Sequence, residues 1–198
     1  MPVYETHRTW EMVPGRLFRE EDCDLYMGGR YAVGAKRHLG HVEVESIGAV
    51  GVFGRSEGAI ARDSPPHHVA ELLVAAAAAL SAEQPSFGMG FLIGRVLWLL
   101  LYRDGGLVYL ASPYVDADAD AVFYVAAHYQ HFGLDRETCP FFLGGGVAQT
   151  GQLHRQLGIY FDLYPLAQRL ETAVVASSDE VALLLAYGTA LQNDVSID

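Results

Sequence analysis

The sequence has one lysine and no hydrophobic run long enough to cross a membrane. Lys36 is that lysine, the other basic residues are arginines, and the formal net charge is −11. A surface this acidic repels phosphate groups, so we expect no nucleic-acid partner and no binding to anionic membranes. Arg95 and Arg103 bracket the run LWLLLY, which is far shorter than the roughly 18 uninterrupted apolar residues of a membrane span.

Cysteine is also scarce. Cys23 and Cys139 are far apart and outside any CxxC spacing, which excludes a disulfide framework and a thiolate metal site. We expect both to be buried or half-buried thiols. The stretch MPVYETHRTW has neither the basic nor the hydrophobic region of a secretory signal, so we expect a cytoplasmic protein. Hydrophobic residues make up 51% of the chain, which predicts a folded, globular protein.

Residues 1–84 begin with strands and end with a helix. HVEVES alternates apolar and polar residues as a half-buried strand does, and IGAVGVFG is typical of a strand covered on both faces. Asp63 or Ser64 then supplies an N-cap, and Gln84 marks the end of the following helix. One apolar stripe is predicted along that helix, formed by Val69, Leu72, Leu73, Ala76 and Leu80.

Residues 85–198 have a second, more regular pattern. Three strands follow from Phe87, with Asp104-Gly105-Gly106 as the turn between the second and third. A helix over AVFYVAAHYQHFGL, the strand PFFLGGG, the helix VAQTGQLHRQLG, a strand around 173–176 and a last helix from about 177 complete the order β-β-β-α-β-α-β-α. This order predicts an α/β fold with a mixed sheet and helices on its faces. The predicted stripe of the first helix consists of Val122, Val125, Ala126, Tyr129 and Phe132.

Two motifs of this second part resemble the actin-like ATPase superfamily, which includes heat-shock chaperones and sugar kinases. PFFLGGGVAQTGQLHRQL is similar to the adenosine motif, an apolar strand followed by glycines and a helix, and SSDEVALLLAYGTALQ is similar to the closing helix. The resemblance implies two RNase H-like lobes, an incomplete first lobe over 1–84 and a second lobe over 85–198.

More narrowly, the chain resembles an uncharacterised bacterial family, a domain of unknown function with this fold. MVPGRLF, AVFYVAAHYQHFGLD and FFLGGG carry that resemblance. It implies that the chain lacks the segment that precedes the first motif in the family. An incomplete lobe exposes a sheet edge, so we expect a homo-oligomer or a protein partner to cover it.

The resemblance also implies a nucleotide site, with ATP and Mg²⁺ as its ligands. Gly144, Gly145, Gly146 and Gln149 are its candidate residues. Phosphoryl transfer further needs a carboxylate beside backbone N–H groups. The second phosphate hairpin should lie in FLIGRVLWLL, which has Gly94 but no Asp, Ser or Thr. We therefore expect a degenerate site with no catalytic residue and no resident cofactor, and a tight turn remains the alternative interpretation of the glycines.

Other sites have weaker support. The pairs His128 and His131, His38 and His41, and His67 and His68 could each ligate a metal, but none has a carboxylate or cysteine at a recognisable spacing. We expect polar loop or helix-cap residues and no metal. Ser56 in GRSEG lacks the flanking pattern of a hydrolase nucleophile, and no GxGxxG follows a strand.

Aromatic residues are dense between residues 98 and 132. Most of them should be core, and some are expected on an oligomer or partner surface, where Tyr and Trp are enriched. The residues concerned are Trp98, Tyr102, Tyr109, Tyr114, Phe123, Tyr124, Tyr129 and Phe132.

Together these sequence patterns favour a non-catalytic, cytoplasmic interaction scaffold. The alternative is a nucleotide-binding ATPase or a kinase-like phosphotransferase that another chain completes.

Overall fold

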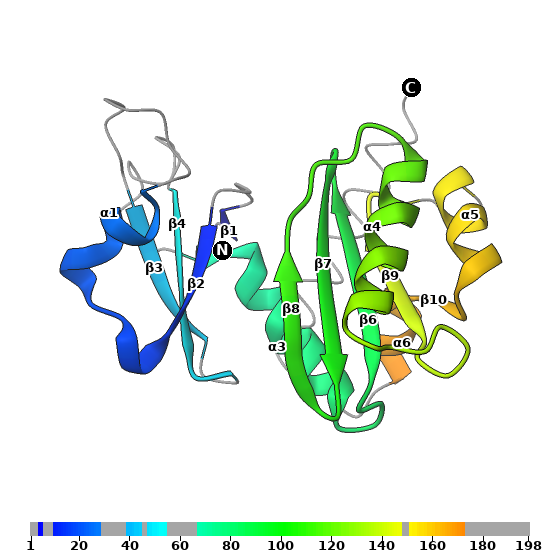
Figure 1. Cartoon of the computed structure of the whole chain (residues 1–198), viewed down its shortest axis with the longest axis horizontal. Helices are drawn as coiled ribbons and strands as arrows, with labels where there is room; N and C mark the ends of the chain where they lie inside the picture. The colour runs from blue at the N-terminus through cyan, green and yellow to red at the C-terminus, as the bar shows by residue number, and fades with distance from the viewer. Residues whose placement is uncertain are drawn as a thin grey trace. The chain divides into compact units, whose positions relative to one another are not determined.

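The computed structural model describes residues 4–5, 10–28, 39–44, 47–54, 67–147 and 151–172. The chain forms two compact units, Met1–Val74 and Ala75–Asp198, which Figure 1 draws. The boundary between them falls within helix α3 (Val69–Ser81). The lobe boundary predicted at residue 84 stays a prediction.

The first unit is built around a small antiparallel sheet. Its strands are β2 (Trp10–Pro14), β3 (Leu39–Val44) and β4 (Ala49–Gly54), in the order β2-β4-β3. Every residue of β4 is buried, as expected for an apolar run covered on both faces. Three short elements follow β2, namely η1 (Gly15–Leu17), η2 (Glu20–Asp22) and α1 (Cys23–Tyr26).

The histidine pair of the first unit directly precedes helix α3. Strand β5 (His67–His68) pairs in parallel with β1 (Tyr4–Glu5). The His68 side chain is buried, its Nδ1 accepts a hydrogen bond from the Ala70 N–H at 3.2 Å, and its ring lies 4.8 Å from that of Phe53. This confirms the expected helix-cap role for His68.

The second unit is a five-stranded mixed sheet with helices on its faces. The strands are β6 (Phe87–Ile93), β7 (Val96–Arg103), β8 (Gly106–Ala111), β9 (Phe141–Gly145) and β10 (Leu163–Pro165). Their order is β10-β9-β6-β7-β8, in which β6, β7 and β8 are antiparallel and β9 and β10 run parallel to β6. The helices are α4 (Asp118–His131), α5 (Gln152–Tyr160) and α6 (Leu166–Thr172).

This arrangement matches the predicted order of elements through the second helix. The short strand β10 and helix α6 are additions that the sequence pattern did not predict. The strand expected around 173–176 and the closing helix lie outside the described residues. Among the described helices, none has both the length and the apolar character that crossing a bilayer requires.

The turn between β7 and β8 is the predicted one. Asp104 and Gly105 both have positive φ, at 54° and 80°. Paired positive φ values give the turn geometry that matches the twist of a two-residue hairpin, and Asp-Gly is a preferred sequence for it. Ser86 Oγ also accepts the Asp104 N–H at 3.0 Å, which fixes the turn to the start of β6.

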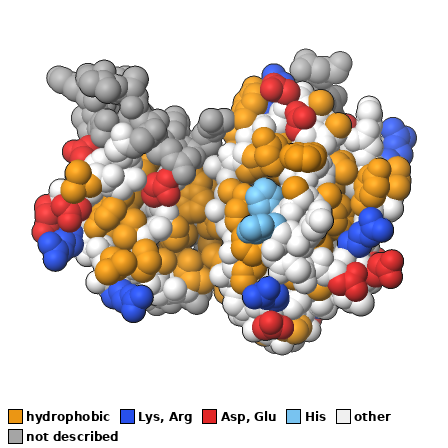
Figure 2. Space-filling view, in the orientation of Figure 1, with side chains coloured by type: hydrophobic (Ala, Val, Ile, Leu, Met, Phe, Trp, Pro, Cys, Tyr) orange, Lys and Arg blue, Asp and Glu red, His pale blue; other side chains and the backbone are white. Residues whose placement is uncertain are grey.

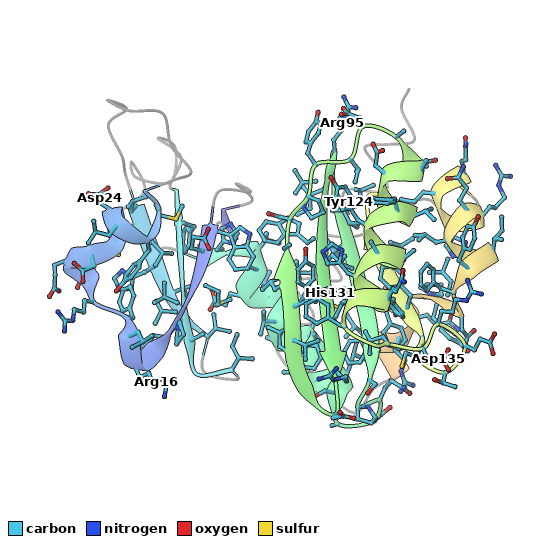
Figure 3. The ribbon with its side chains drawn as sticks, viewed as in Figure 1. Arg16, Asp24, Arg95, Tyr124, His131 and Asp135 are labelled. Carbon is cyan, nitrogen blue, oxygen red and sulfur yellow. The ribbon has the colours of Figure 1, made fainter. Side chains whose placement is uncertain are left out.

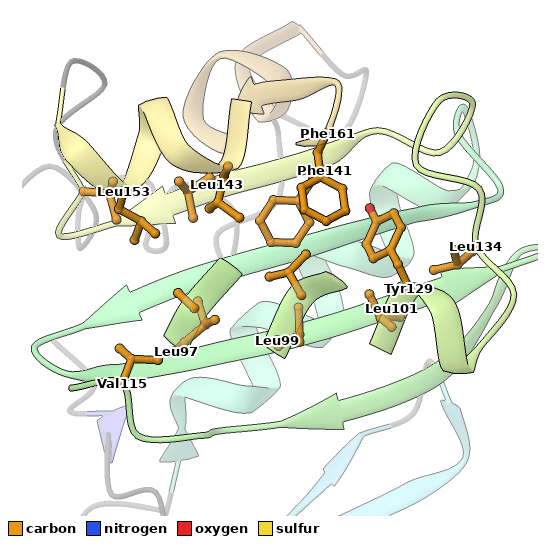
Figure 4. Close-up of a cluster of buried hydrophobic side chains, with 14 of the residues drawn as sticks. Leu97, Leu99, Leu101, Val115, Tyr129, Leu134, Phe141, Leu143, Leu153 and Phe161 are labelled. Atoms are coloured by element: carbon orange, nitrogen blue, oxygen red, sulfur yellow. The ribbon is translucent and has the colours of Figure 1, made fainter. Parts of the chain in front are cut away.

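The main core of the second unit lies between the sheet and helices α4 and α5 (Figure 4). Phe141 of β9 is at its centre, with Tyr129 of α4 and Phe161 packed edge-on or tilted against it at 5.9–6.2 Å. The predicted α4 stripe is confirmed at Val125 and Tyr129 but is wrong at Ala126, which is exposed. Residues 121, 125 and 129 define the buried line, and position 126 is turned about 100° away from position 125.

A row of aromatic rings crosses the opposite face of the sheet. Phe87 stacks on Tyr102 at 5.1 Å, Phe142 lies 5.4 Å from Phe87, and Tyr164 lies 6.2 Å from Phe142. The row runs from β7 across β6 and β9 to β10. Tyr102 is 2% exposed and Tyr164 is 45% exposed, so the row leads from the core to the surface.

Removing the Tyr102 hydroxyl should stabilise the protein at neutral pH. Within the described part of the chain, this hydroxyl has no hydrogen-bond partner. A buried, unpaired hydroxyl costs about 1 kcal/mol or more, so we expect Tyr102→Phe to raise the free energy of unfolding by that amount and to move the urea midpoint upward. Tyr129→Phe is the matched control. Its hydroxyl donates to the Pro140 carbonyl at 2.9 Å, and its loss should lower the midpoint.

The same variant should change the alkaline limit of stability. Burial raises the pKa of Tyr102 to about 12, from 10.0. The unfolded chain releases this proton first, so ionisation of Tyr102 has no effect on stability below pH 10 and lowers stability as the pH rises from 10 to about 12. We expect Tyr102→Phe to unfold over a higher pH range in circular dichroism. A urea midpoint that falls in Tyr102→Phe as it does in Tyr129→Phe would contradict the first expectation, and an unchanged alkaline unfolding range would contradict the second.

Candidate functional site

The candidate nucleotide site lies at one edge of the second sheet. Because β6, β9 and β10 run parallel, their carboxyl ends meet at this edge (Figure 1). In open α/β sheets this is the edge at which ligands bind. The predicted glycines end β9 here, and the turn between β6 and β7 lies beside them.

Gly145 is locked against the backbone of β6. Its φ is +85°, and a Cβ placed on it would lie 2.2 Å from the Leu92 carbonyl oxygen and 2.7 Å from the Leu92 nitrogen. Only glycine allows two backbones to approach this closely. The close contact that this glycine permits is therefore with the neighbouring strand.

The amide groups that follow Gly145 are already used inside the turn. The Gly146 N–H donates to the Leu92 carbonyl at 2.8 Å, and the Val147 N–H donates to the Gly145 carbonyl at 2.8 Å. A phosphate-binding loop instead turns several such N–H groups toward its ligand. Neither of these two donors is left for a phosphate in this conformation.

Gly144 has a packing role on the other face of the sheet. A Cβ at this position would lie 3.0 Å from Leu166 Cδ2 and 3.1 Å from Phe91 Cδ2, closer than these side chains tolerate without moving. Gly144 thus makes room for Leu166, the first residue of α6. Gln149, the fourth candidate residue, lies outside the described residues.

The β6–β7 turn, where a second phosphate hairpin was expected, presents an arginine. Gly94 and Arg95 form the turn, and Arg95 is labelled in Figure 3. Its Nη2 forms an ion pair with Asp116 Oδ1 and donates to the Asp116 carbonyl at 3.0 Å. Its guanidinium also lies 4.9 Å from the ring centroid of Tyr114. The positive charge at this edge is therefore paired with the segment that leads into α4.

The acidic residues at 116–120 have different structural roles, which the sequence pattern did not distinguish from one another. Besides the pairing of Asp116 with Arg95, Asp120 Oδ2 accepts the N–H groups of Asp116 and Ala117, each at 2.9 Å. These bonds cap the first turn of α4, where a carboxylate also suits the positive end of the helix dipole. Sequence reasoning missed Arg95, although it is the one charged residue within an otherwise apolar hairpin run.

The histidines of the second unit are part of an aromatic cluster. His128 Nδ1 lies 2.7 Å from the Tyr124 carbonyl oxygen, and its ring stacks on Tyr109 at 4.2 Å. His131 packs edge-on against Phe132 at 4.8 Å. Among the described residues, no three His, Cys, Asp or Glu side chains lie close enough together to hold a metal ion.

The remaining candidates for chemistry are in the first unit, apart from Cys139. The His41 ring lies 5.1 Å from that of Phe18, and its predicted partner His38 lies outside the described residues, as does Ser56. Both thiols are free, with Cys23 half-buried and Cys139 buried, as expected. Burial and then the neighbouring acids raise the pKa of Cys23, which makes it a poor nucleophile at neutral pH.

The aromatic residues divide between the core and one surface. Trp98, Tyr102 and Tyr129 are buried, whereas Phe123 is 68% exposed and Tyr114 is 42% exposed. The half-buried aromatic residues of α4 and β8 form one group with Phe123. We call this group the aromatic surface, and its members are Tyr109, Phe123, Tyr124, His128 and Phe132. Tyr124 and the neighbouring His131 are labelled on α4 in Figure 3.

Comparison with known proteins identifies the fold. No family model matches the sequence, and neither does any curated protein. The structure is similar to a crystal structure at 1.85 Å resolution of a protein from Bacteroides thetaiotaomicron, described as having an actin-like ATPase fold and unknown function. The TM-score is 0.74 at 14% sequence identity, over 91% of this chain and 71% of that chain. The chain therefore has the actin-like ATPase fold that its motifs predicted. Membership of the family and the absence of its first segment stay predictions.

Proposed function

We propose that this protein is a cytoplasmic, non-catalytic scaffold that keeps the actin-like ATPase fold and associates as a homodimer. The main support for the absence of catalysis is the contact of the glycine turn with the Leu92 backbone. The Gly145 backbone is packed on β6, and the Gly146 and Val147 amides are bonded within the turn. A nucleotide phosphate would have to break these bonds before it could use the same donors.

The β6–β7 turn supports the same proposal. Phosphoryl transfer in this kind of site requires a carboxylate to hold Mg²⁺ beside the phosphates. The turn offers Gly94 and Arg95 instead, and Arg95 is paired with Asp116. The described residues of this turn therefore do not fit Mg²⁺, and we assign them no step of hydrolysis.

The aromatic surface supports the interaction part of the proposal. Phe123 is exposed beside the half-buried Tyr124, and neither the strand β8 nor the outer face of α4 at Ala119, Phe123 and Ala126 carries a charge. Two copies of a chain with a net charge of −11 repel each other over most of their surface. A contact through uncharged aromatic side chains avoids that repulsion. Figure 2 shows hydrophobic side chains at the surface of each unit.

Isothermal titration of the full chain with ATP and Mg²⁺ tests the non-catalytic part. We expect no saturable heat, which corresponds to a Kd weaker than about 1 mM, and no phosphate release. The alternative function, a nucleotide-binding ATPase or a phosphotransferase completed by another chain, predicts a clear isotherm. Binding in the micromolar range with phosphate release would overturn the scaffold proposal.

Sedimentation velocity tests the dimer. We expect a dimer for the unmodified chain and a shift toward monomer for Phe123→Asp, because the new carboxylate would face its copy across the contact. Ile159→Asp is the matched control, since Ile159 is 74% exposed on α5 and outside the aromatic surface. A monomeric unmodified chain, or equal dimers in both variants, would exclude this surface.

A further inference from the structure

A pocket lies at the edge of the sheet opposite the glycine turn. It has a volume of about 470 Å³ and is lined by residues at the amino ends of β9 and β10 and on α6. This volume falls within the range of about 300–1,000 Å³ that is typical of small-molecule sites. We call it the amino-edge pocket. Its lining residues are Gln84, Thr138, Pro140, Phe142, Asp162, Tyr164, Pro165, Gln168 and Arg169.

Main-chain hydrogen bonds hold the walls of the amino-edge pocket in place. The Pro140 carbonyl accepts the Gly88 N–H at 3.0 Å, and the Asp162 carbonyl accepts the Phe141 N–H at 2.9 Å. These bonds tie the two loops before β9 and β10 to buried strands. A ligand would therefore enter a pocket that is already formed and would lose little affinity to ordering it.

The basic side chain of the pocket lining is paired with an acid, whereas the acidic side chain of the lining has no basic partner among the described residues. Arg169 Nη2 lies 2.7 Å from Glu83 Oε2, so its positive charge is compensated by a residue outside the lining. Asp162 has no basic partner among the described residues. The Tyr164 hydroxyl donates to its Oδ2 at 2.9 Å and leaves Oδ1 without a hydrogen bond there. The lining thus presents one uncompensated carboxylate.

Aromatic rings stand next to that carboxylate. Phe142 is 3% exposed, and the Tyr164 ring, 45% exposed, lies 6.2 Å from it. An aromatic face attracts a cation through its quadrupole and also offers apolar contact. The hydrogen bond to Asp162 and its charge raise the pKa of Tyr164, so the hydroxyl stays a donor that orients the carboxylate. A carboxylate beside an aromatic face suits an ammonium group with an apolar body.

We propose that the amino-edge pocket binds a small organic cation, with its ammonium at Asp162 and its apolar body against Phe142 and Tyr164. The Asp162 carboxylate would repel an anion, and Arg169, which could attract one, is already paired with Glu83. A neutral molecule could donate a hydrogen bond to Asp162 but would leave the negative charge of its carboxylate unpaired. The site is independent of the nucleotide question, because it lies at the opposite ends of the strands.

Titration of the ¹⁵N-labelled full chain with phenethylammonium tests the site by NMR. We expect saturable amide shifts at residues around the pocket, with a Kd of about 1 mM or tighter. The neutral probe 2-phenylethanol, which has the same ring, should bind about fivefold more weakly or worse, because it lacks the charge that pairs with Asp162.

Two variants locate the cation. Asp162→Asn keeps an acceptor for the Tyr164 hydroxyl and should weaken phenethylammonium binding about fivefold or more. Asp118→Asn makes the same charge change in the first turn of α4, at the other edge of the sheet, and should leave the Kd unchanged. Since Asp162 and Asp118 are not buried, both variants should fold and give the spectrum of the unmodified chain.

Four results would overturn the proposal. The first is the absence of saturable shifts with phenethylammonium. The second is equal binding of 2-phenylethanol, and the third is equal weakening by Asp162→Asn and Asp118→Asn. If an arginine-containing peptide binds to the pocket and phenethylammonium does not, the pocket is a site for a protein partner. That result would likewise exclude a small-molecule site.

Discussion

Gly145→Ala is expected to destabilise the protein by about 3 kcal/mol or more in urea unfolding monitored by circular dichroism. Two costs add at this position. The φ of +85° disfavours any side chain, and the new Cβ would lie 2.2 Å from the Leu92 carbonyl oxygen. The contact is with backbone, so no rotamer change can relieve it. The β6–β9 pairing would have to open at this end.

Gly94→Ala is the matched control for this change. Gly94 also has a positive φ, at +56°, but a Cβ there meets nothing within 4 Å. We expect a loss of only about 1 kcal/mol, the cost of the backbone conformation alone. The difference between the two variants measures the close approach of β9 to β6. Equal losses would show that this approach is not a constraint on the sequence.

The Gly145 result also bears on how the nucleotide question can be tested. A bulky substitution such as Gly145→Val removes space needed by the fold itself. Loss of binding in that variant would therefore not separate a nucleotide contact from unfolding. Titration of the unmodified chain with ATP avoids this ambiguity.

Phe141→Ala is expected to lower the free energy of unfolding by about 4 kcal/mol. The side chain is fully buried between the sheet and α4, and it packs on Tyr129 and Phe161 (Figure 4). Its ring also fills the space that Gly88 and Gly90 leave on β6, where an added Cβ would lie 2.7 Å from ring atoms. Truncation would leave a cavity beside rigid backbone that cannot collapse into it.

Ile159→Ala is the control for Phe141→Ala. It truncates a large apolar side chain that is 74% exposed on α5 and lies outside the aromatic surface, so we expect a change of less than about 0.5 kcal/mol. Differential scanning calorimetry of the three proteins gives the comparison directly. A Phe141→Ala protein as stable as Ile159→Ala would contradict the placement of Phe141 at the centre of the core.

Local pattern was sufficient for much of the second unit. The turn at Asp104-Gly105 was predicted because its residue types favour positive φ, and the structure confirms it. The α3 stripe, from Val69 to Leu80, is buried at every predicted position. Periodicity and turn chemistry act within a few residues, so the sequence displays them directly.

Two elements were missed because their stability is not local. Strand β10 has three residues and ends in a proline, which is too short for an alternating pattern. It exists because Leu163 and Tyr164 pair in parallel with Phe141 and Phe142. Helix α6 begins at the next residue, Leu166, which packs on Gly144.

By itself, then, the sequence determined the mixed α/β class, the order of elements from β6 to α5 and the negative net charge, since each depends on residue type and short-range spacing. Only the tertiary structure decided what the glycines and charges do. It placed Leu92 against Gly145, Asp116 against Arg95 and Glu83 against Arg169. The two residues of each pair are 21 to 86 positions apart in the sequence, and both arginines donate hydrogen bonds in these contacts. Those contacts depend on strand register and chain crossing, which no local pattern encodes.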